Sequence, residues 1–231
     1  MSEPLDAPRI VFVRGQLFVE AANYVRELII SGQLQPGDRV KPEFVAERLG
    51  ISTTPAREAL HALAGEGFLR LEPRRGFAVA RLTGADIRDV FRANSLLAGE
   101  LAARAAERIT PDDLETLQDI QTQIIAVRDD AEQVETLNHA FHRQVNLLAD
   151  APKIAIVLRT LSKYAPRQFF GTIHGWPAAT IHDHGDLLTA FAAKDAEAAR
   201  AAMSAHIENA GDLLADSLDA RLAQAAESSA D

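Results

Sequence analysis

The hydrophobic pattern of this 231-residue chain changes once, near Arg81, and that change limits the folds open to it. Beyond Arg81 the apolar residues recur at the three- and four-residue spacing of helices, and no alternating strand pattern returns. Before Arg81, helical segments precede two short runs typical of strands, at 68–71 and 76–80. We therefore expect a mainly α-helical protein, in which a small module of helices and one hairpin precedes a larger, all-helical part.

The composition excludes several classes of protein. The chain has no cysteine, which rules out a disulfide framework, a cysteine-ligated zinc finger, an iron–sulfur cluster and a thiol nucleophile. Its aromatic content of 6% is low for a β-sandwich or a barrel. No apolar run approaches the roughly 18 residues of a membrane span, and Glu3 and Asp6 stand where a secretion signal would carry basic residues. These features predict a cytoplasmic protein with no membrane partner.

Charge is distributed unevenly between the two parts. Residues 1–81 carry 11 basic and 10 acidic side chains, whereas the remainder carries 13 and 23, so the net charge of −9 comes from the C-terminal part. Phosphate attraction is local, since the Debye length is about 8–10 Å at physiological salt. An acidic protein can therefore still bind DNA through a separate module, and residues 1–81 are the part suited to it.

The N-terminal segments can be placed from their caps and breakers. Helices are expected at 16–31, 42–49 and 52–64, and Gly50 is expected to close the second of them in a left-handed conformation. Ser52 stands at the capping position of the third helix. The two strand-like runs that follow are joined by a short polar turn, which is typical of a hairpin.

A winged helix-turn-helix has the order helix, helix, tight turn, helix and hairpin. We expect this fold over 16–81, after an N-terminal arm at 1–15. In such a fold the third helix enters the major groove and the hairpin tip reaches the minor groove or its phosphates. Arginine suits a guanine edge, and Ser or Thr suits a phosphate. The candidate DNA contacts are Ser52, Thr53, Thr54, Arg57, His61, Arg74, Arg75 and Gly76. The competing interpretation is a small α+β domain with ordinary solvated charges.

Four short motifs run in order through these helices, the turn and the hairpin. They are Leu34-x-Pro36-Gly37-x-x-Val40, Val45-Ala46-Glu47-x-Leu49-Gly50-Ile51-Ser52-x-Thr54-Pro55-x-Arg57-Glu58-Ala59-Leu60, Leu63-x-x-Glu66-Gly67, and Arg75-Gly76-Phe77-x-Val79. Together they resemble the GntR family of bacterial transcription regulators, over about 16–80. The resemblance implies that Ser52, Thr54 and Arg57 face DNA and that Gly76 shapes the wing. Thr53 stands where the family usually has arginine, which predicts a weaker contact or a different operator.

The C-terminal part is predicted to be an antiparallel bundle of six Ala- and Leu-rich helices with short connections. We expect this domain over 82–225, followed by a polar tail at 226–231. The first two expected helices begin at Thr83–Asp86 and at Thr110–Asp113. Four more are expected at 131–148, 152–170, 178–193 and 196–225.

Histidines concentrate in this bundle, which holds six of the seven in the chain. Asn138 and His142 are four residues apart and project from one face of a helix, while His184 and His206 lie on two others. Three imidazoles and an amide oxygen at one point would suit a divalent ion such as Zn²⁺ or Ni²⁺. The competing interpretation is that these are scattered surface or core histidines.

The bundle carries three further motifs. They are Asn138-x-x-Phe141-His142, Asp183-His184-x-x-Leu187-Leu188-x-Ala190-Phe191, and Asp195-Ala196-Glu197-x-Ala199-x-x-Ala202-Met203-x-x-His206. Over about 84–220 they resemble the FCD ligand-binding domain found in this regulator family. The resemblance implies a metal site at Asn138, His142, His184 and His206, where metal-binding members have Asp, His, His and His. Asn138 keeps a carbonyl oxygen but removes a charge, which predicts weaker metal binding.

The resemblance also implies where an effector would bind. Family members often have Arg and Glu at the positions of Asn94 and Ala98, so a carboxylate would lack one common contact here. Arg92 is a substitute whose face is about half a turn away, and Arg159 is another candidate, unless it pairs with surface acids. The candidate effector-binding residues are therefore Asn94, Arg92 and Arg159.

These observations predict a DNA-binding transcription regulator, not an enzyme. It is expected to be a homodimer that binds a palindromic double-stranded operator, with a small organic acid as effector at a divalent metal site. One alternative keeps the regulator and gives it a metal-free pocket for a larger or apolar ligand. A remote alternative is a metal-dependent hydrolase, for which the sequence offers no motif-supported general base.

Overall fold

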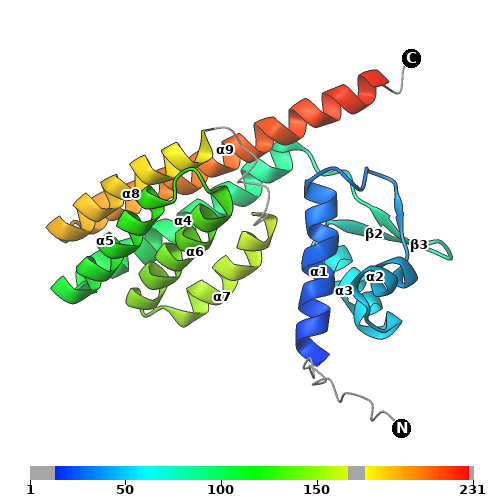
Figure 1. Cartoon of the computed structure of the whole chain (residues 1–231), viewed down its shortest axis with the longest axis horizontal. Coiled ribbons are helices and arrows are strands. Elements are labelled where there is room, and N and C mark those ends of the chain that lie inside the picture. Colours follow the sequence, from blue (N-terminus) through cyan, green and yellow to red (C-terminus); the bar gives the residue numbers. More distant parts are fainter. Residues whose placement is uncertain (1–13, 166–174, 229–231) are drawn as a thin grey trace, which may run out of the picture. The chain divides into compact units, whose positions relative to one another are not determined.

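The computed structural model describes residues 14–165 and 175–228 of the chain, and the fold divides into two compact units after Arg81. Figure 1 shows both units, a smaller one with three helices and a small sheet and a larger one built of helices. The expected fold class, mainly α with a winged helix-turn-helix and a helical bundle, is confirmed.

Within its described residues, 14–81, the first unit has three helices and three short strands. The helices are α1 (Arg14–Ile30), α2 (Pro42–Leu49) and α3 (Thr53–Gly65), and the strands are β1 (Arg39–Val40), β2 (Leu69–Glu72) and β3 (Gly76–Val79). Strands β2 and β3 form the expected hairpin, with Leu71 opposite Phe77. Strand β1 pairs antiparallel with the other edge of β3, in the order β1-β3-β2. The sequence analysis missed β1 because two residues carry no alternating pattern.

Local chemistry explains the turn between α2 and α3. Gly50 ends α2 at φ 65°, the left-handed conformation expected for it. Ser52 occupies the capping position of α3, but its side chain makes no capping hydrogen bond, so that part of the prediction was wrong. The orientation of α3 comes from packing instead, because Ala56, Leu60 and Leu63 are fully buried.

The second unit is helical throughout the part that the structure describes. Its elements are α4 (Gly84–Arg108), α5 (Pro111–Ala126), α6 (Ala131–Leu148), α7 (Pro152–Leu161), the 3₁₀ turn η1 (Ser162–Tyr164), α8 (Trp176–Ala193) and α9 (Ala196–Ser228). Capping boxes start α4 at Thr83 and α5 at Thr110. The helix predicted at 152–170 is shorter than expected, because α7 ends at Leu161 and gives way to η1. Residues 166–174 lie outside the described part of the chain.

Helices α4 and α9 approach each other closely. A Cβ at Gly211 of α9 would lie 2.5 Å from the Cβ of Phe91, and one at Gly99 of α4 would lie 2.4 Å from Ser204 Oγ. Glycine at these positions removes the atoms that would hold the two helices apart. The core beside this contact contains the fully buried Leu101, Leu117, Phe141, Leu187 and Phe191.

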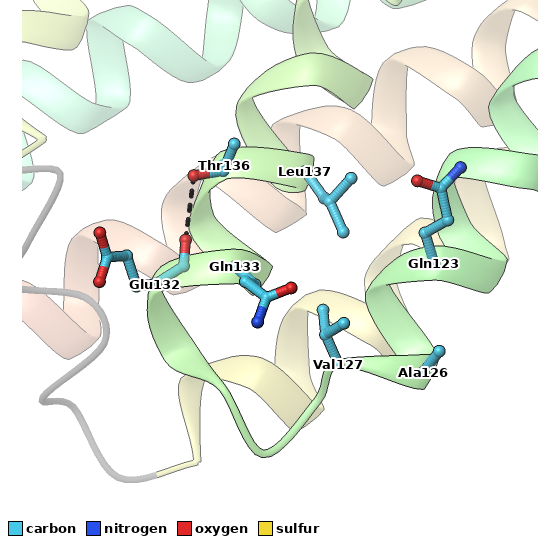
Figure 2. Close-up of a pocket in the computed structure, with 7 residues that line it drawn as sticks. All are labelled: Gln123, Ala126, Val127, Glu132, Gln133, Thr136 and Leu137. Atoms are coloured by element: carbon cyan, nitrogen blue, oxygen red, sulfur yellow. Dashed lines mark hydrogen bonds between the residues drawn. The ribbon is translucent and has the colours of Figure 1, made fainter.

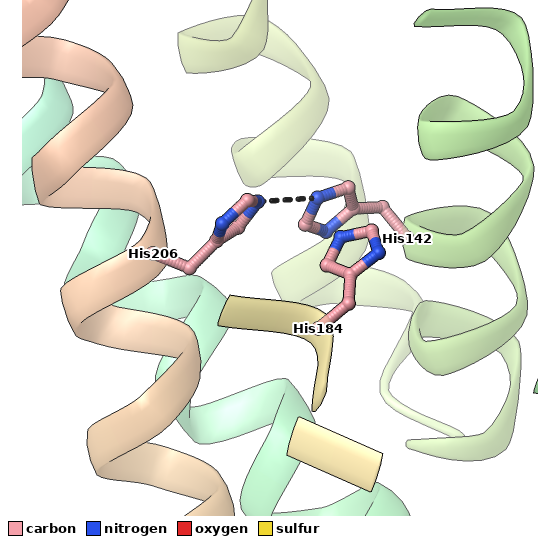
Figure 3. A group of neighbouring side chains, drawn as sticks. All are labelled: His142, His184 and His206. Atoms are coloured by element: carbon pink, nitrogen blue, oxygen red, sulfur yellow. Dashed lines mark hydrogen bonds between the residues drawn. The ribbon is translucent and has the colours of Figure 1, made fainter. Parts of the chain in front are cut away.

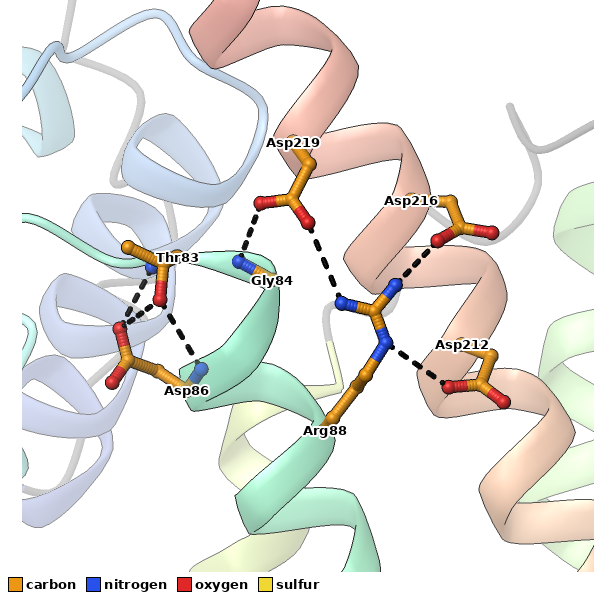
Figure 4. Close-up of polar contacts among 7 residues, drawn as sticks. All are labelled: Thr83, Gly84, Asp86, Arg88, Asp212, Asp216 and Asp219. Carbon is orange, nitrogen blue, oxygen red and sulfur yellow. Dashed lines mark hydrogen bonds and ion pairs between the residues drawn. The ribbon is translucent and has the colours of Figure 1, made fainter.

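Ion pairs follow the same contact between α4 and α9. Arg88 of α4 faces three aspartates of α9, with Nε 3.3 Å from Asp212, Nη2 2.5 Å from Asp216 and Nη1 3.4 Å from Asp219 (Figure 4). Asp219 also accepts a hydrogen bond of 2.8 Å from the backbone N–H of Gly84. The first turn of α4 is therefore tied to α9 by both a backbone and a side-chain contact.

None of the helices in the described residues combines the length and the apolar character needed to cross a membrane.

Candidate functional site

Three histidines from three helices of the second unit converge at one point. His142 lies on α6, His184 on α8 and His206 on α9, and Figure 3 shows their rings facing one another. One ring nitrogen of each lies within 4.8 Å of the others, and the Nε2 atoms of His142 and His206 are 3.1 Å apart. We call these three residues the histidine cluster. Two nitrogens bound about 2.0–2.1 Å from one tetrahedral ion are roughly 3.3 Å apart, so the spacing suits shared coordination.

Hydrogen bonds determine which nitrogen each ring presents. His206 Nδ1 lies 3.1 Å from Asp183 Oδ2, and an ionised carboxylate can only accept, so Nδ1 carries the proton. His184 Nδ1 lies 3.1 Å from Gln121 Oε1, while Gln121 Nε2 donates to the carbonyl of Ile181. His184 therefore also carries its proton on Nδ1. Both rings then present an Nε2 lone pair.

Two polar atoms of the predicted ligand set are buried and have no hydrogen-bond partner within the described part of the chain. They are His184 Nε2 and Asn138 Oδ1. Asn138 lies one turn before His142 on α6, so both side chains project from the same face. A buried acceptor without a partner costs roughly 1–3 kcal/mol. A bound cation would satisfy both atoms, and one amide oxygen with three imidazoles is a donor set that fits Zn²⁺ or Ni²⁺.

The electrostatics of the cluster favour neutral imidazoles at His142 and His184. Burial, with smaller contributions from the charges of His206 and His139, lowers the pKa of His142 to about 3. Burial also holds the pKa of His184 well below its usual value, and the Phe141 ring stacks on that imidazole at a centroid distance of 4.0 Å. Neutral rings keep the lone pairs that a metal ion requires.

The structure also locates the candidate effector-binding residues. Asn94 is 4% exposed, inside the bundle on α4. Arg92 is largely exposed and pairs with Glu208 of α9, so its charge is already engaged. Arg159 is exposed on α7. The sequence analysis missed Gln121 and Asp183; the position of Asp183 directly before His184 was the available signal, whereas nothing in the sequence pointed to Gln121.

A separate hollow of about 400 Å³ lies where α5 meets α6 (Figure 2). Glu132 is the charged residue among its lining side chains, so the hollow offers no cationic group for an acid. Its lining residues are Gln123, Ala126, Val127, Glu132, Gln133, Thr136 and Leu137. None of them belongs to the histidine cluster.

In the first unit, all of the candidate DNA contacts are exposed. The eight residues, which we call the candidate DNA surface, are Ser52, Thr53, Thr54, Arg57, His61, Arg74, Arg75 and Gly76. The His61 ring meets the Phe77 ring edge-on at 4.9 Å, which ties α3 to strand β3. Arg57 extends from α3 with a side chain 58% exposed and lies 3.8 Å from Glu43 of α2. A pair this exposed costs little to break, so Arg57 can turn to another anion.

The hairpin tip has a backbone suited to presenting its arginines. Arg74 and Gly76 both adopt positive φ, 65° and 83°, and Arg75 N–H donates to the carbonyl of Glu72. This tight turn leaves Arg74 and Arg75 exposed at the end of the hairpin.

Comparison with known proteins places both units in one family. Residues 17–79 match the family described as "Bacterial regulatory proteins, gntR family", and residues 89–209 match the FCD domain. The chain therefore belongs to the GntR family of bacterial transcription regulators and carries an FCD domain.

Individual relatives agree with this assignment. The chain is 27% identical to the HTH-type transcriptional regulator McbR of Escherichia coli over 80% of this chain and 86% of the relative. It is 26% identical to the HTH-type transcriptional repressor RspR of the same species, over 80% and 82%. The solved structure of E. coli McbR/YncC superposes with a TM-score of 0.66, covering 84% of this chain and 94% of the other at 26% identity. These relatives are transcription regulators and not enzymes, and the chain is one as well.

Proposed function

We propose that this regulator binds a palindromic double-stranded DNA operator as a homodimer and responds to a small carboxylate effector held beside a divalent metal ion. In this proposal residues 16–81 bind DNA, and residues 82–225 bind the effector and dimerise. A DNA-binding role places the protein in the cytoplasm.

The observation that carries the metal part is the pair of buried acceptors without partners, His184 Nε2 and Asn138 Oδ1, beside His142 and His206. Asn138, His142, His184 and His206 would hold the ion. All four are neutral donors, so a bound dication keeps its full charge inside a buried site. The ion would supply the electrostatic attraction for a carboxylate.

The DNA part is supported by the exposure of the candidate DNA surface and by the match to the GntR family. Arg57 suits a bidentate contact with guanine, and Arg74 and Arg75 suit the minor groove. Two DNA-binding units related by two-fold symmetry would contact two half-sites that run in opposite directions.

Regulation sets one thermodynamic condition. The effector must bind the DNA-competent and DNA-incompetent states with different affinity, because a ligand with equal affinity for both shifts nothing. The coupling between effector and DNA is therefore measurable from either side.

Metal content of the untagged protein tests the metal part. By mass spectrometry we expect about one Zn or Ni per subunit, as a single closed site requires, and loss of that metal in His142→Ala. His139→Ala is the matched control, because it removes an exposed imidazole from the same helix. Absence of metal after incubation with excess ion would contradict the proposal and direct the search to a larger or apolar ligand.

Fluorescence anisotropy tests the DNA part. The probe is the duplex that the wild-type protein selects from a random pool. Arg57→Ala is expected to weaken binding by about 1–3 kcal/mol, the value of one good base contact, while the circular dichroism of the bundle stays unchanged. Equal affinity of wild type and variant would remove Arg57 from the DNA contacts.

A further inference from the structure

We propose that Asp183 is the positioning residue of the metal site, which fixes His206 as an Nε2 donor and supplies the negative charge that the four ligands lack. This inference rests on the proposed function, because it concerns the same site.

Asp183 is turned into the protein, whereas His182 and Asp186 on the same helix point outward. Its side chain is 14% exposed, compared with 76% for His182 and 67% for Asp186. Oδ2 lies 3.1 Å from His206 Nδ1 and 3.4 Å from Asn209 Nδ2. Both partners lie on α9, three residues apart, so one face of α9 holds the carboxylate from two points.

The hydrogen bond to Asp183 decides how His206 can act. With its proton on Nδ1, the ring presents an Nε2 lone pair toward His142, whose Nε2 is 3.1 Å away. A carboxylate at the far nitrogen also makes an imidazole a stronger donor, and such partners are frequent behind metal-binding histidines. Asp183 therefore orients the ring and increases its basicity.

Gln121 orients the ring of His184 but does not increase its basicity. Its amide is oriented by donation to the carbonyl of Ile181, so Oε1 faces His184 Nδ1. Gln121 is neutral, as are Asn138 and the imidazoles. Asp183 thus brings a full negative charge to within one ring of the ion and partly replaces the charge that Asn138 does not provide.

Zinc affinity measured by competition with a chromophoric chelator tests the role of the charge. Asp183→Asn removes the charge from a side chain of the same shape, and we expect the dissociation constant to rise about 10- to 100-fold, the usual effect of losing such a partner. Asp186→Asn removes the same charge from the exposed side of the same helix and is expected to stay within about twofold. Asp183→Glu is expected to recover most of the loss. Equal affinity of Asp183→Asn and wild type, or an equal loss in Asp186→Asn, would overturn the proposal.

Nitrogen-15 NMR of the metal-free protein tests the positioning role independently. We expect His206 to have its proton on Nδ1 in wild type, and the Nε2-protonated form to appear in Asp183→Ala. A His206 that stays fully Nδ1-protonated in Asp183→Ala would overturn the positioning role. Thermal unfolding of each metal-free variant verifies that it is folded.

The two experiments separate this inference from the proposed function. If wild type binds no zinc, the proposed metal site is wrong and the role of the charge is wrong with it, while the tautomer of His206 still decides the positioning role. If wild type binds zinc and Asp183→Asn binds it equally well, only the inference is wrong.

Discussion

Gly211 of α9 lies so close to Phe91 of α4 that a Cβ on the glycine would be 2.5 Å from the Cβ of the phenylalanine. Phe91 is buried, with 3% of its surface exposed. Gly211 lies within helix α9 and is not among the glycines with positive φ. It is therefore needed for the close approach of the two helices and not for an unusual backbone conformation. The packing of α4 on α9 therefore depends on the absence of a methyl group at Gly211, as it does at Gly99.

Gly211→Ala is expected to destabilise the protein. Overpacking a core costs about 1–3 kcal/mol, and the better helix propensity of alanine offsets up to about 1 kcal/mol of that. Gly185→Ala is the control, because Gly185 lies within α8 and a Cβ there meets nothing within 4 Å. We expect its midpoint of thermal unfolding to be unchanged or raised. Equal midpoints for Gly211→Ala and Gly185→Ala would contradict the close approach.

Asn138→Asp is expected to tighten metal binding. Each charged ligand added to a buried dication increases affinity, here by about tenfold or more. Isothermal titration with zinc measures the change, with Gln118→Glu as a control that adds the same charge at an exposed position of α5. An affinity unchanged in Asn138→Asp would mean that this side chain does not bind the ion.

Thr53→Arg is expected to strengthen DNA binding and its dependence on salt. Thr53 is exposed at the first position of α3, within the candidate DNA surface. One added phosphate contact makes the slope of log K against log salt steeper by about 0.9. Random-sequence duplex DNA is a sufficient probe, since phosphate contacts do not depend on sequence. Thr122→Arg adds the same charge to α5 and should leave the slope unchanged; an equal slope for both variants would argue against a phosphate contact at residue 53.

Glu100 gives a prediction about pH. Hydrogen bonds from Arg200 and then Arg104 lower the pKa of this carboxyl below its usual value. A lowered pKa in the folded state means that the contribution to stability is present above the unfolded pKa and is lost as the pH falls through the folded one. Its side chain is 31% exposed, so we expect Glu100→Gln to cost only about 0.5–1 kcal/mol at pH 7. The difference between the two proteins should shrink as the pH falls below the usual pKa of a glutamate, and it should vanish once the pH lies below the lowered pKa of folded Glu100.

Urea unfolding of wild type and Glu100→Gln, followed at several pH values, measures this difference. Glu197→Gln is the comparison, because its carboxylate also approaches Arg200 but is 82% exposed. We expect a smaller effect from it at every pH. A difference for Glu100→Gln that does not shrink as the pH is lowered would show that its origin is not the charge.

The sequence was sufficient to predict most elements, because their signals are local. The capping-box-like segment at Thr83, the helix start at Thr110 and the left-handed Gly50 mark helix ends within three or four residues, and all three were confirmed. Strand β1 was missed because it forms by pairing with β3, which lies far along the chain. The helix predicted at 152–170 was too long, because α7 ends at Leu161 and η1 at Tyr164. Pro166 was the overlooked signal, since a proline disfavours helix at the residue before it.

The histidine cluster was predictable for a different reason. Asn138 and His142 share a helix face by their spacing, but only the resemblance to a family connected them with His184 and His206. Of the partners behind the rings, Asp183 was signalled only by its place beside His184, and Gln121 by nothing, because both contacts are recognised only once α5, α8 and α9 are packed together. Such contacts depend on tertiary distances that periodicity does not encode.

The three rings of the histidine cluster come from α6, α8 and α9, so the ribosome delivers them one after another and His206 last. The first unit, which ends at Arg81, has been synthesised long before, and N-terminal domains generally fold first. An ion that needs all three rings can therefore enter only a nearly finished chain, and cannot guide the folding of the part that would bind DNA. We expect a chain cut short within α8 to keep its DNA-binding unit and to escape control by any signal read at the cluster.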